Sequence, residues 1–63
     1  MREFLRACGL NPEQINMVEV FILLYKYESL EELLAKTTEE LAEHPGWDDD
    51  IAHCISLIRQ HQP

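Results

Sequence analysis

The spacing of apolar residues along the chain predicts helices from end to end. Near the C-terminus, Ile51, Cys54, Ile55 and Ile58 recur at the i, i+3, i+4, i+7 spacing of one helix face. The apolar run between residues 12 and 26 is the only stretch that could also form a strand. From the start and stop residues between the apolar stretches, we expect an all-α fold of five short helices. Their bounds lie near residues 2–8, 12–26, 30–35, 38–43 and 49–61.

Helix start and stop signals set these bounds. Gly9 is a natural stop, because glycine takes the left-handed conformation that ends a helix at little cost, and Asn11, followed by proline, is a typical start. The segments 29–32 and 37–40 each pair a Ser or Thr with a Glu three residues later. This is the spacing of a capping box, in which the hydroxyl accepts the N3 amide and the carboxylate accepts the N-cap amide. We expect one aspartate of residues 48–50 to cap the last helix.

The inward-facing side of each helix predicts the hydrophobic core. In the central helix, Ile15, Val18, Ile22 and Tyr25 form one apolar stripe. The short helices at 30–35 and 38–43 would turn leucines inward and glutamates toward water. The core residues that we expect are Phe4, Leu5, Ile15, Val18, Ile22, Leu30, Leu33, Leu34, Leu41, Ile51, Ile55 and Ile58.

The central helix carries a second apolar stripe beside the first one. The other four helices could wrap the central helix on all sides. Alternatively, the second stripe could meet a partner subunit, because five short helices have little surface with which to enclose it. The residues that would then contact the partner are Met17, Val20, Phe21, Leu24, Tyr25 and Trp47. Phe21 could equally be core, and Trp47 could equally be a lid over its own turn.

Length and charge narrow the range of functions. The chain has 63 residues and a formal net charge of −7, with nine of its twelve acidic residues between Glu28 and Asp50. We interpret it as one small domain, residues 1–63. Nucleic acids are held mainly by Lys and Arg side chains that neutralise phosphates, and the five basic residues of this chain are scattered. We therefore expect direct nucleic-acid binding to be weak or absent.

The sequence contains no constellation typical of an enzyme, a metal centre or a cofactor site. His53 and Cys54 are adjacent, so on a helix they point about 100° apart and cannot share one ion, and the consecutive carboxylates of 48–50 also diverge. We expect Cys8 and Cys54 to be buried thiols and His44 to be solvated. With neither a signal peptide nor a segment long enough to span a bilayer, an intracellular protein is the expectation.

Two turns, each between a short helix and a longer one, give the chain a repeated layout: Gly9-Leu10-Asn11 and Gly46-Trp47-Asp48. With the Ser-Leu-Glu-Glu-Leu and Thr-Glu-Glu-Leu segments and a Pro-Gly turn, this layout resembles a tandem helix-hairpin-helix (SAM-like) domain. It is similar to the C-terminal domain of the XPF-type structure-specific nucleases and their non-catalytic partners. The resemblance implies a nuclear protein of DNA repair or DNA recombination. It also implies pairing with a second helix-hairpin-helix subunit, as a heterodimer or a homodimer.

Both turns depart from the DNA-binding form of that family. A DNA-binding hairpin holds a phosphate with its backbone amides, usually near a Lys or Arg. After the first turn, Pro12 removes an amide and Glu13 adds a negative charge. The second turn ends in the first of three consecutive aspartates, residues 48–50. We therefore interpret the chain as a non-catalytic dimerisation module whose hairpins are degenerate for DNA binding. The alternative is a sterile-alpha-motif or other small acidic helical interaction domain unrelated to DNA.

Overall fold

Five helices account for most of the chain. The structure, a computed structural model, describes residues 1–62 and contains no strand within them. Each helix begins at its predicted residue and ends one or two residues before its predicted end, so the all-α fold is confirmed. The helices are α1 (Arg2–Ala7), α2 (Pro12–Leu24), α3 (Leu30–Leu34), α4 (Thr38–Ala42) and α5 (Asp49–Gln60).

The predicted caps form at the starts of α2, α4 and α5. The Asn11 side chain accepts the Gln14 amide, and the Gln14 side chain accepts the Asn11 amide in return. Thr37 and Glu40 form the same reciprocal pair, and these hydrogen bonds hold the pKa of the Glu40 carboxyl below its usual range. Asp48 is the aspartate that caps α5. Each cap satisfies amides that a helix start would otherwise leave without a partner.

The capping box expected at α3 is only half formed. The Ser29 hydroxyl accepts the Glu32 amide at 3.2 Å, as predicted. The Glu32 carboxylate, however, accepts the amide of Glu28 at 2.9 Å and not that of Ser29. The Glu32 carboxylate therefore fixes the backbone of Glu28, the residue before the cap, in the connection between α2 and α3.

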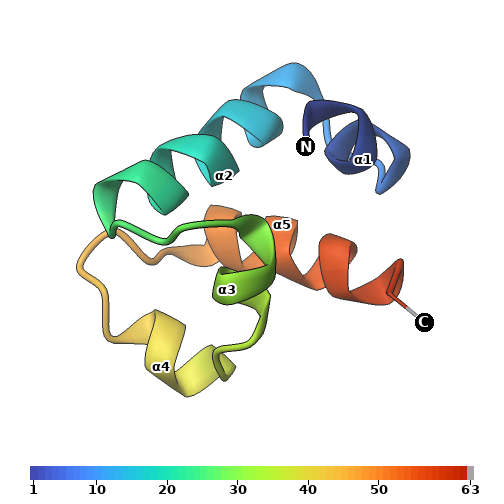
Figure 1. Cartoon of the computed structure of the whole chain (residues 1–63). Helices are drawn as coiled ribbons and strands as arrows, with labels where there is room; N and C mark the ends of the chain where they lie inside the picture. Colours follow the sequence, from blue (N-terminus) through green and yellow to red (C-terminus); the bar gives the residue numbers. More distant parts are fainter. Residues whose placement is uncertain (63) are drawn as a thin grey trace.

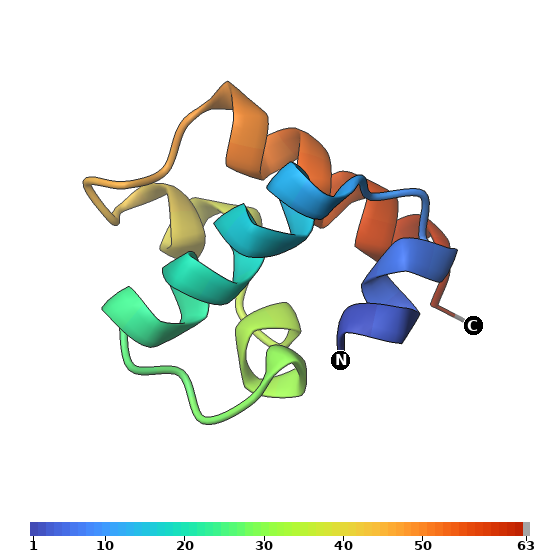
Figure 2. The same ribbon diagram turned by 90° about the horizontal axis from the view of Figure 1, so that it is seen from above.

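The two longer helices, α2 and α5, pack against each other in the middle of the fold, and α1 packs on α2. Figures 1 and 2 show that α1 lies toward the C-terminal end of α5. The short helices α3 and α4 form the return path from α2 to α5. The radius of gyration is 10.6 Å, which is about the value for a compact chain of this length.

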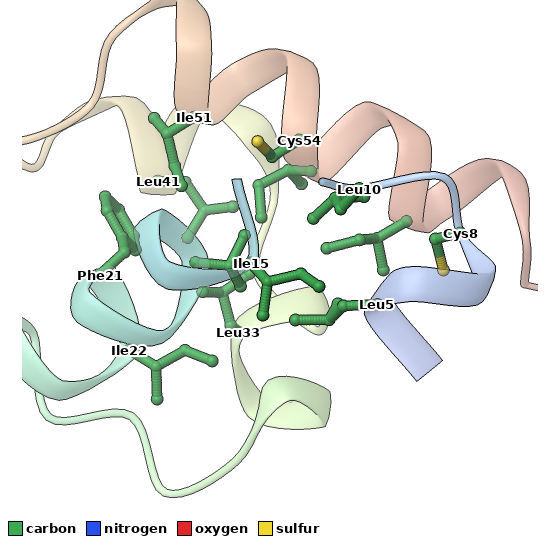
Figure 3. Packing of buried hydrophobic residues seen from close by; sticks show 13 residues of the cluster. Leu5, Cys8, Leu10, Ile15, Phe21, Ile22, Leu33, Leu41, Ile51 and Cys54 are labelled. Carbon is green, nitrogen blue, oxygen red and sulfur yellow. The ribbon is translucent and has the colours of Figure 1, made fainter. Parts of the chain in front are cut away.

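The core is one cluster to which every helix contributes (Figure 3). Leu5 of α1, Leu33 of α3 and Leu41 of α4 are completely buried, so each short helix is held mainly by one leucine. The buried residues are Leu5, Cys8, Leu10, Ile15, Val18, Phe21, Ile22, Leu33, Leu41, Ile51, Cys54, Ile55 and Ile58. Both cysteines are free thiols, and burial raises the pKa of each.

Three residues predicted for the core lie outside it. Phe4 is 41 % exposed, and Leu30 and Leu34 are only partly buried. Leu5 and Cys8 already fill the inward side of α1, and Phe4, one residue earlier, points about 100° away from Leu5. Phe4 instead lines a surface hollow of about 600 Å³ together with Leu30 and Leu34.

One arginine joins α5 to the end of α3. The Arg59 guanidinium donates hydrogen bonds to the carbonyl oxygens of Lys36, at 2.9 Å, and Leu34, at 3.4 Å. These carbonyls belong to the last turn of α3 and the residues after it, where a helix leaves acceptors without intrahelical donors. Arg59 is thus a structural residue and not part of a basic surface.

We expect Leu33→Ala to lower the free energy of unfolding by ~2–5 kcal/mol, because it empties a completely buried site. Leu23→Ala is the matched control, since Leu23 is 76 % exposed and its truncation should change stability by about 0.5 kcal/mol or less. Urea unfolding followed by far-ultraviolet circular dichroism measures both. Equal losses in the two variants would contradict the packing described above.

Candidate functional site

An aromatic cluster centred on His44 borders the second turn. The Tyr25 ring stacks on the His44 imidazole with ring centroids 4.0 Å apart, and the Tyr27 hydroxyl lies 2.7 Å from His44 Nε2. Burial, with the nearby carboxylates of Glu32 and Glu40, raises the pKa of the Tyr27 hydroxyl above its ordinary value. The expectation that His44 is solvated is wrong, because the imidazole is half-buried between two tyrosines.

The chain brings these tyrosines to His44 by reversing direction after α2. Lys26 has a φ of 59°, in the left-handed region that ends helices. The reversal turns Tyr25, at the end of α2, and Tyr27, just beyond it, toward the second turn. Glycine is the residue usually found at such a position. Because lysine stands there instead, the sequence gives little indication of this bend.

Phe21 belongs to the core of the domain itself. Its side chain is 4 % exposed and makes edge contacts with His44 and Trp47, with centroid separations of 5.6 and 6.1 Å. Phe21 is therefore not available to a partner, and the prediction that it contacts one needs correction. Trp47 is half-buried against Phe21.

The side of α2 next to Phe21 is exposed to solvent. Val20 is 50 % exposed, Leu24 61 % and Leu23 76 %, and Met17 beside them is partly buried. We call these four residues the α2 apolar face. Leu23 was absent from the predicted contact residues, although it follows Val20 by three positions and so lies about 60° from it around the helix.

A groove of about 260 Å³ runs beside this face, between α2 and the start of α5. Its lining is mostly apolar. Met17, Val20 and Leu24 form part of one wall, and Gly46, Asp48 and Ile51 contribute to the other. Of the residues predicted for partner contact, the structure brings Met17, Val20 and Leu24 together here.

A close contact, and not its backbone conformation, favours glycine at position 46. Its amide donates a hydrogen bond to the Tyr25 hydroxyl at 2.6 Å, and a Cβ at this position would lie 2.7 Å from the same oxygen. Gly9, in the first turn, is the opposite case, because its φ is +96° and a Cβ there would meet no atom within 4 Å. The two turns thus use glycine for different physical reasons.

The amides of the first turn are already used within the protein. The Gly9 amide donates to the Arg6 carbonyl, the Leu10 amide to that of Leu5, and the Asn11 amide to the Gln14 side chain. Leu10 is itself buried in the core. At the start of α2, Pro12 has no amide hydrogen. The amides of Gln14 and Ile15 donate to the side chain and the carbonyl of Asn11. Among the described residues at this helix start, only the Glu13 amide could still donate a hydrogen bond to a ligand, and Glu13 itself carries a negative charge.

The second turn is similarly occupied. The Gly46 amide donates to Tyr25, and the Trp47 amide donates to the His44 carbonyl at 3.0 Å. The Asp48 side chain accepts the Ile51 amide at 2.9 Å, so a carboxylate already occupies the start of α5. A phosphate at this position would have to displace it and would also meet the charges of the two following aspartates.

Other kinds of site find no support in the part of the chain that the structure describes. In residues 1–62, no three His, Cys, Asp or Glu side chains are grouped so that they could hold a metal ion. Within the same range, no helix combines the length and the apolar character needed to cross a membrane.

No protein-family model matches the chain, and no significant match to it was found among curated proteins or solved structures. The similarity to helix-hairpin-helix domains stays a prediction based on the residues that carry it.

We expect Tyr25→Phe and Gly46→Ala to be coupled. Tyr25→Phe removes the acceptor of the Gly46 amide and should cost ~0.5–1.5 kcal/mol of stability. In the Gly46→Ala background, the same change also removes the oxygen that the new methyl group would meet, so it should cost less or stabilise. A double-mutant cycle by urea unfolding, with Trp47 fluorescence as the probe, measures the coupling. Additive effects would contradict the contact.

Proposed function

We propose that this domain is a non-catalytic protein-interaction module that binds a partner through the α2 apolar face. The observation that carries the proposal is the exposure of Val20, Leu23 and Leu24 side by side on one helix. Single exposed leucines are common on protein surfaces, whereas a cluster of large apolar side chains is typical of an interface.

The energetics favour a partner. Fully burying one Val or Leu side chain is worth ~1.5–3 kcal/mol, so covering three half-exposed ones would contribute several kcal/mol to binding. The loss of Phe21 as a contact removes the large aromatic anchor that the sequence suggested. Leu23 and Leu24 take its place as the side chains with most surface to bury.

The hairpins support a role other than DNA binding. Most of their amides already have acceptors within the domain, and carboxylates follow both turns. Only scattered basic residues oppose the charge of −7, and two of them are engaged: Arg2 pairs with Glu19, and Arg59 binds backbone carbonyls. In a tandem helix-hairpin-helix domain of this kind, pairing with a second subunit is the function that remains.

The setting of DNA repair or recombination, and with it a nuclear location, rests on the family resemblance alone. Within that setting the partner is a second helix-hairpin-helix subunit or another copy of this chain. The α2 apolar face serves either arrangement, and association measurements distinguish them.

We expect the purified domain to form a discrete complex, either with itself or one-to-one with a chain recovered from cells that express it. Leu24→Glu places a charge on the exposed face and should weaken the complex about tenfold or more, as at a binding hot spot. Ala7→Glu, an equally charged change at an exposed position of α1, is the control. Sedimentation velocity measures the complex. A domain that stays monomeric and recovers no partner, or an unchanged Leu24→Glu complex, would refute the proposal.

Binding of the isolated domain to duplex DNA should be weaker than about 1 μM near 150 mM salt. If residual binding is measured, Arg2, Arg6 and Lys26 are the expected contacts, and replacing each arginine by alanine should flatten the salt dependence. Fluorescence anisotropy over a series of salt concentrations tests this. Submicromolar affinity would show that the carboxylates at the two turns do not exclude the phosphate backbone.

A further inference from the structure

The groove beside the α2 apolar face has one apolar end and one acidic end. Met17 lines the apolar groove and also a second hollow of about 270 Å³, so the two are neighbours along α2. The second hollow lies between the start of α2 and the start of α5, and its lining includes Glu13, Asp50 and His53. The side chains along this path thus change from apolar to acidic.

The carboxylates along this path have no cationic partner in residues 1–62. The ion pair found in that part of the chain joins Arg2 to Glu19 and lies elsewhere. Neither hollow is lined by a lysine or an arginine. Asp48 at the apolar groove and Glu13 and Asp50 at the acidic end are exposed, so their charges are free to attract a basic group.

We propose that this groove binds a basic amphipathic helix of a partner protein. This inference rests on the proposed function and names the chemistry of the partner. The apolar side of that helix would lie on Met17, Val20 and Leu24, and its Lys or Arg residues would reach Asp48 and Asp50 or the nearby Glu13. From Glu13 to Leu24, α2 rises about 16 Å, which three turns of a bound helix would span.

A second copy of this chain fits the groove poorly. A symmetric dimer would bring the same carboxylate-bearing face of both copies into one interface, and each copy carries a charge of −7. Within residues 1–62 there is also no basic amphipathic helix of that length to offer. Residues Pro12–Leu24 contain no Lys or Arg, and Arg59 is the one such residue in α5. Charge complementarity therefore favours a different, basic chain.

Two designed peptides test the inference. Both form a helix of about four turns with leucines along one side, and the remaining positions are lysine in one peptide and glutamate in the other. Each is titrated into the methyl-labelled domain, and nuclear magnetic resonance follows the methyl groups of Met17, Val20 and Leu24. We expect the lysine peptide to shift these methyl signals and to bind about tenfold or more tightly than the glutamate peptide.

Two matched variants separate recognition by the groove from general attraction to an acidic protein. Asp50 and Glu39 are both exposed, and both occupy the second position of their helices. Asp50→Lys should weaken binding of the lysine peptide about threefold to fivefold, whereas Glu39→Lys should change it less than about twofold. Circular dichroism verifies that both variants keep the helical fold.

Equal effects of the two variants, shifts confined to other methyl groups, or equal binding of both peptides would overturn the inference. So would self-association of the domain through the same methyl groups, because a second copy would then be the occupant. The proposed function fails separately, when Leu24→Glu leaves the complex recovered from cells unchanged. If the two peptides bind equally while Leu24→Glu still weakens the complex, only the basic helix is rejected and the proposed function stands.

Discussion

The packing of α2 on α5 is the contact on which the rest of this domain depends. These are the two helices with more than two turns, and isolated helices as short as α1, α3 and α4 are not stable in water. Each short helix is held in place mainly by one completely buried leucine that reaches the cluster between the long helices. The short helices are therefore attached to the α2–α5 pair, and they cover only the part of α2 that faces it.

This dependence explains why α2 is left with an exposed apolar face. Its buried stripe is covered by α5, α1 and the leucines of α3 and α4, and no further element remains for the opposite side. The aromatic cluster closes the end of α2 near the second turn, where Phe21 becomes core. Val20, Leu23 and Leu24 remain exposed beside that cluster. The exposed face thus follows from the small number of long helices as well as from the composition of α2.

The sequence predicted helix starts better than side-chain environments, and the reason is physical. A start is set by local hydrogen bonds, such as those of Asn11 and Thr37, which act over three residues. Whether Phe4 or Phe21 is buried depends on which elements arrive from elsewhere in the chain. Periodicity places both on apolar faces, yet Phe21 meets His44 and Trp47, whereas Phe4 lines an open hollow. The part of the candidate site contributed by Met17, Val20 and Leu24 was predictable because it lies within one helix.

The polar groups of the second turn disfavour phosphate binding and also place carboxylates beside the apolar groove. Tyr25 and Asp48 occupy the amides of Gly46 and Ile51, so the turn is ordered by the protein itself and has little left with which to hold a phosphate. The same Asp48 borders the apolar groove, and Asp50 lies at its acidic end. Carboxylates that repel nucleic acid at this position are well placed to attract a cation on a protein surface. On the proposal made above, the same carboxylates at the start of α5 would both disfavour a phosphate and attract a basic partner.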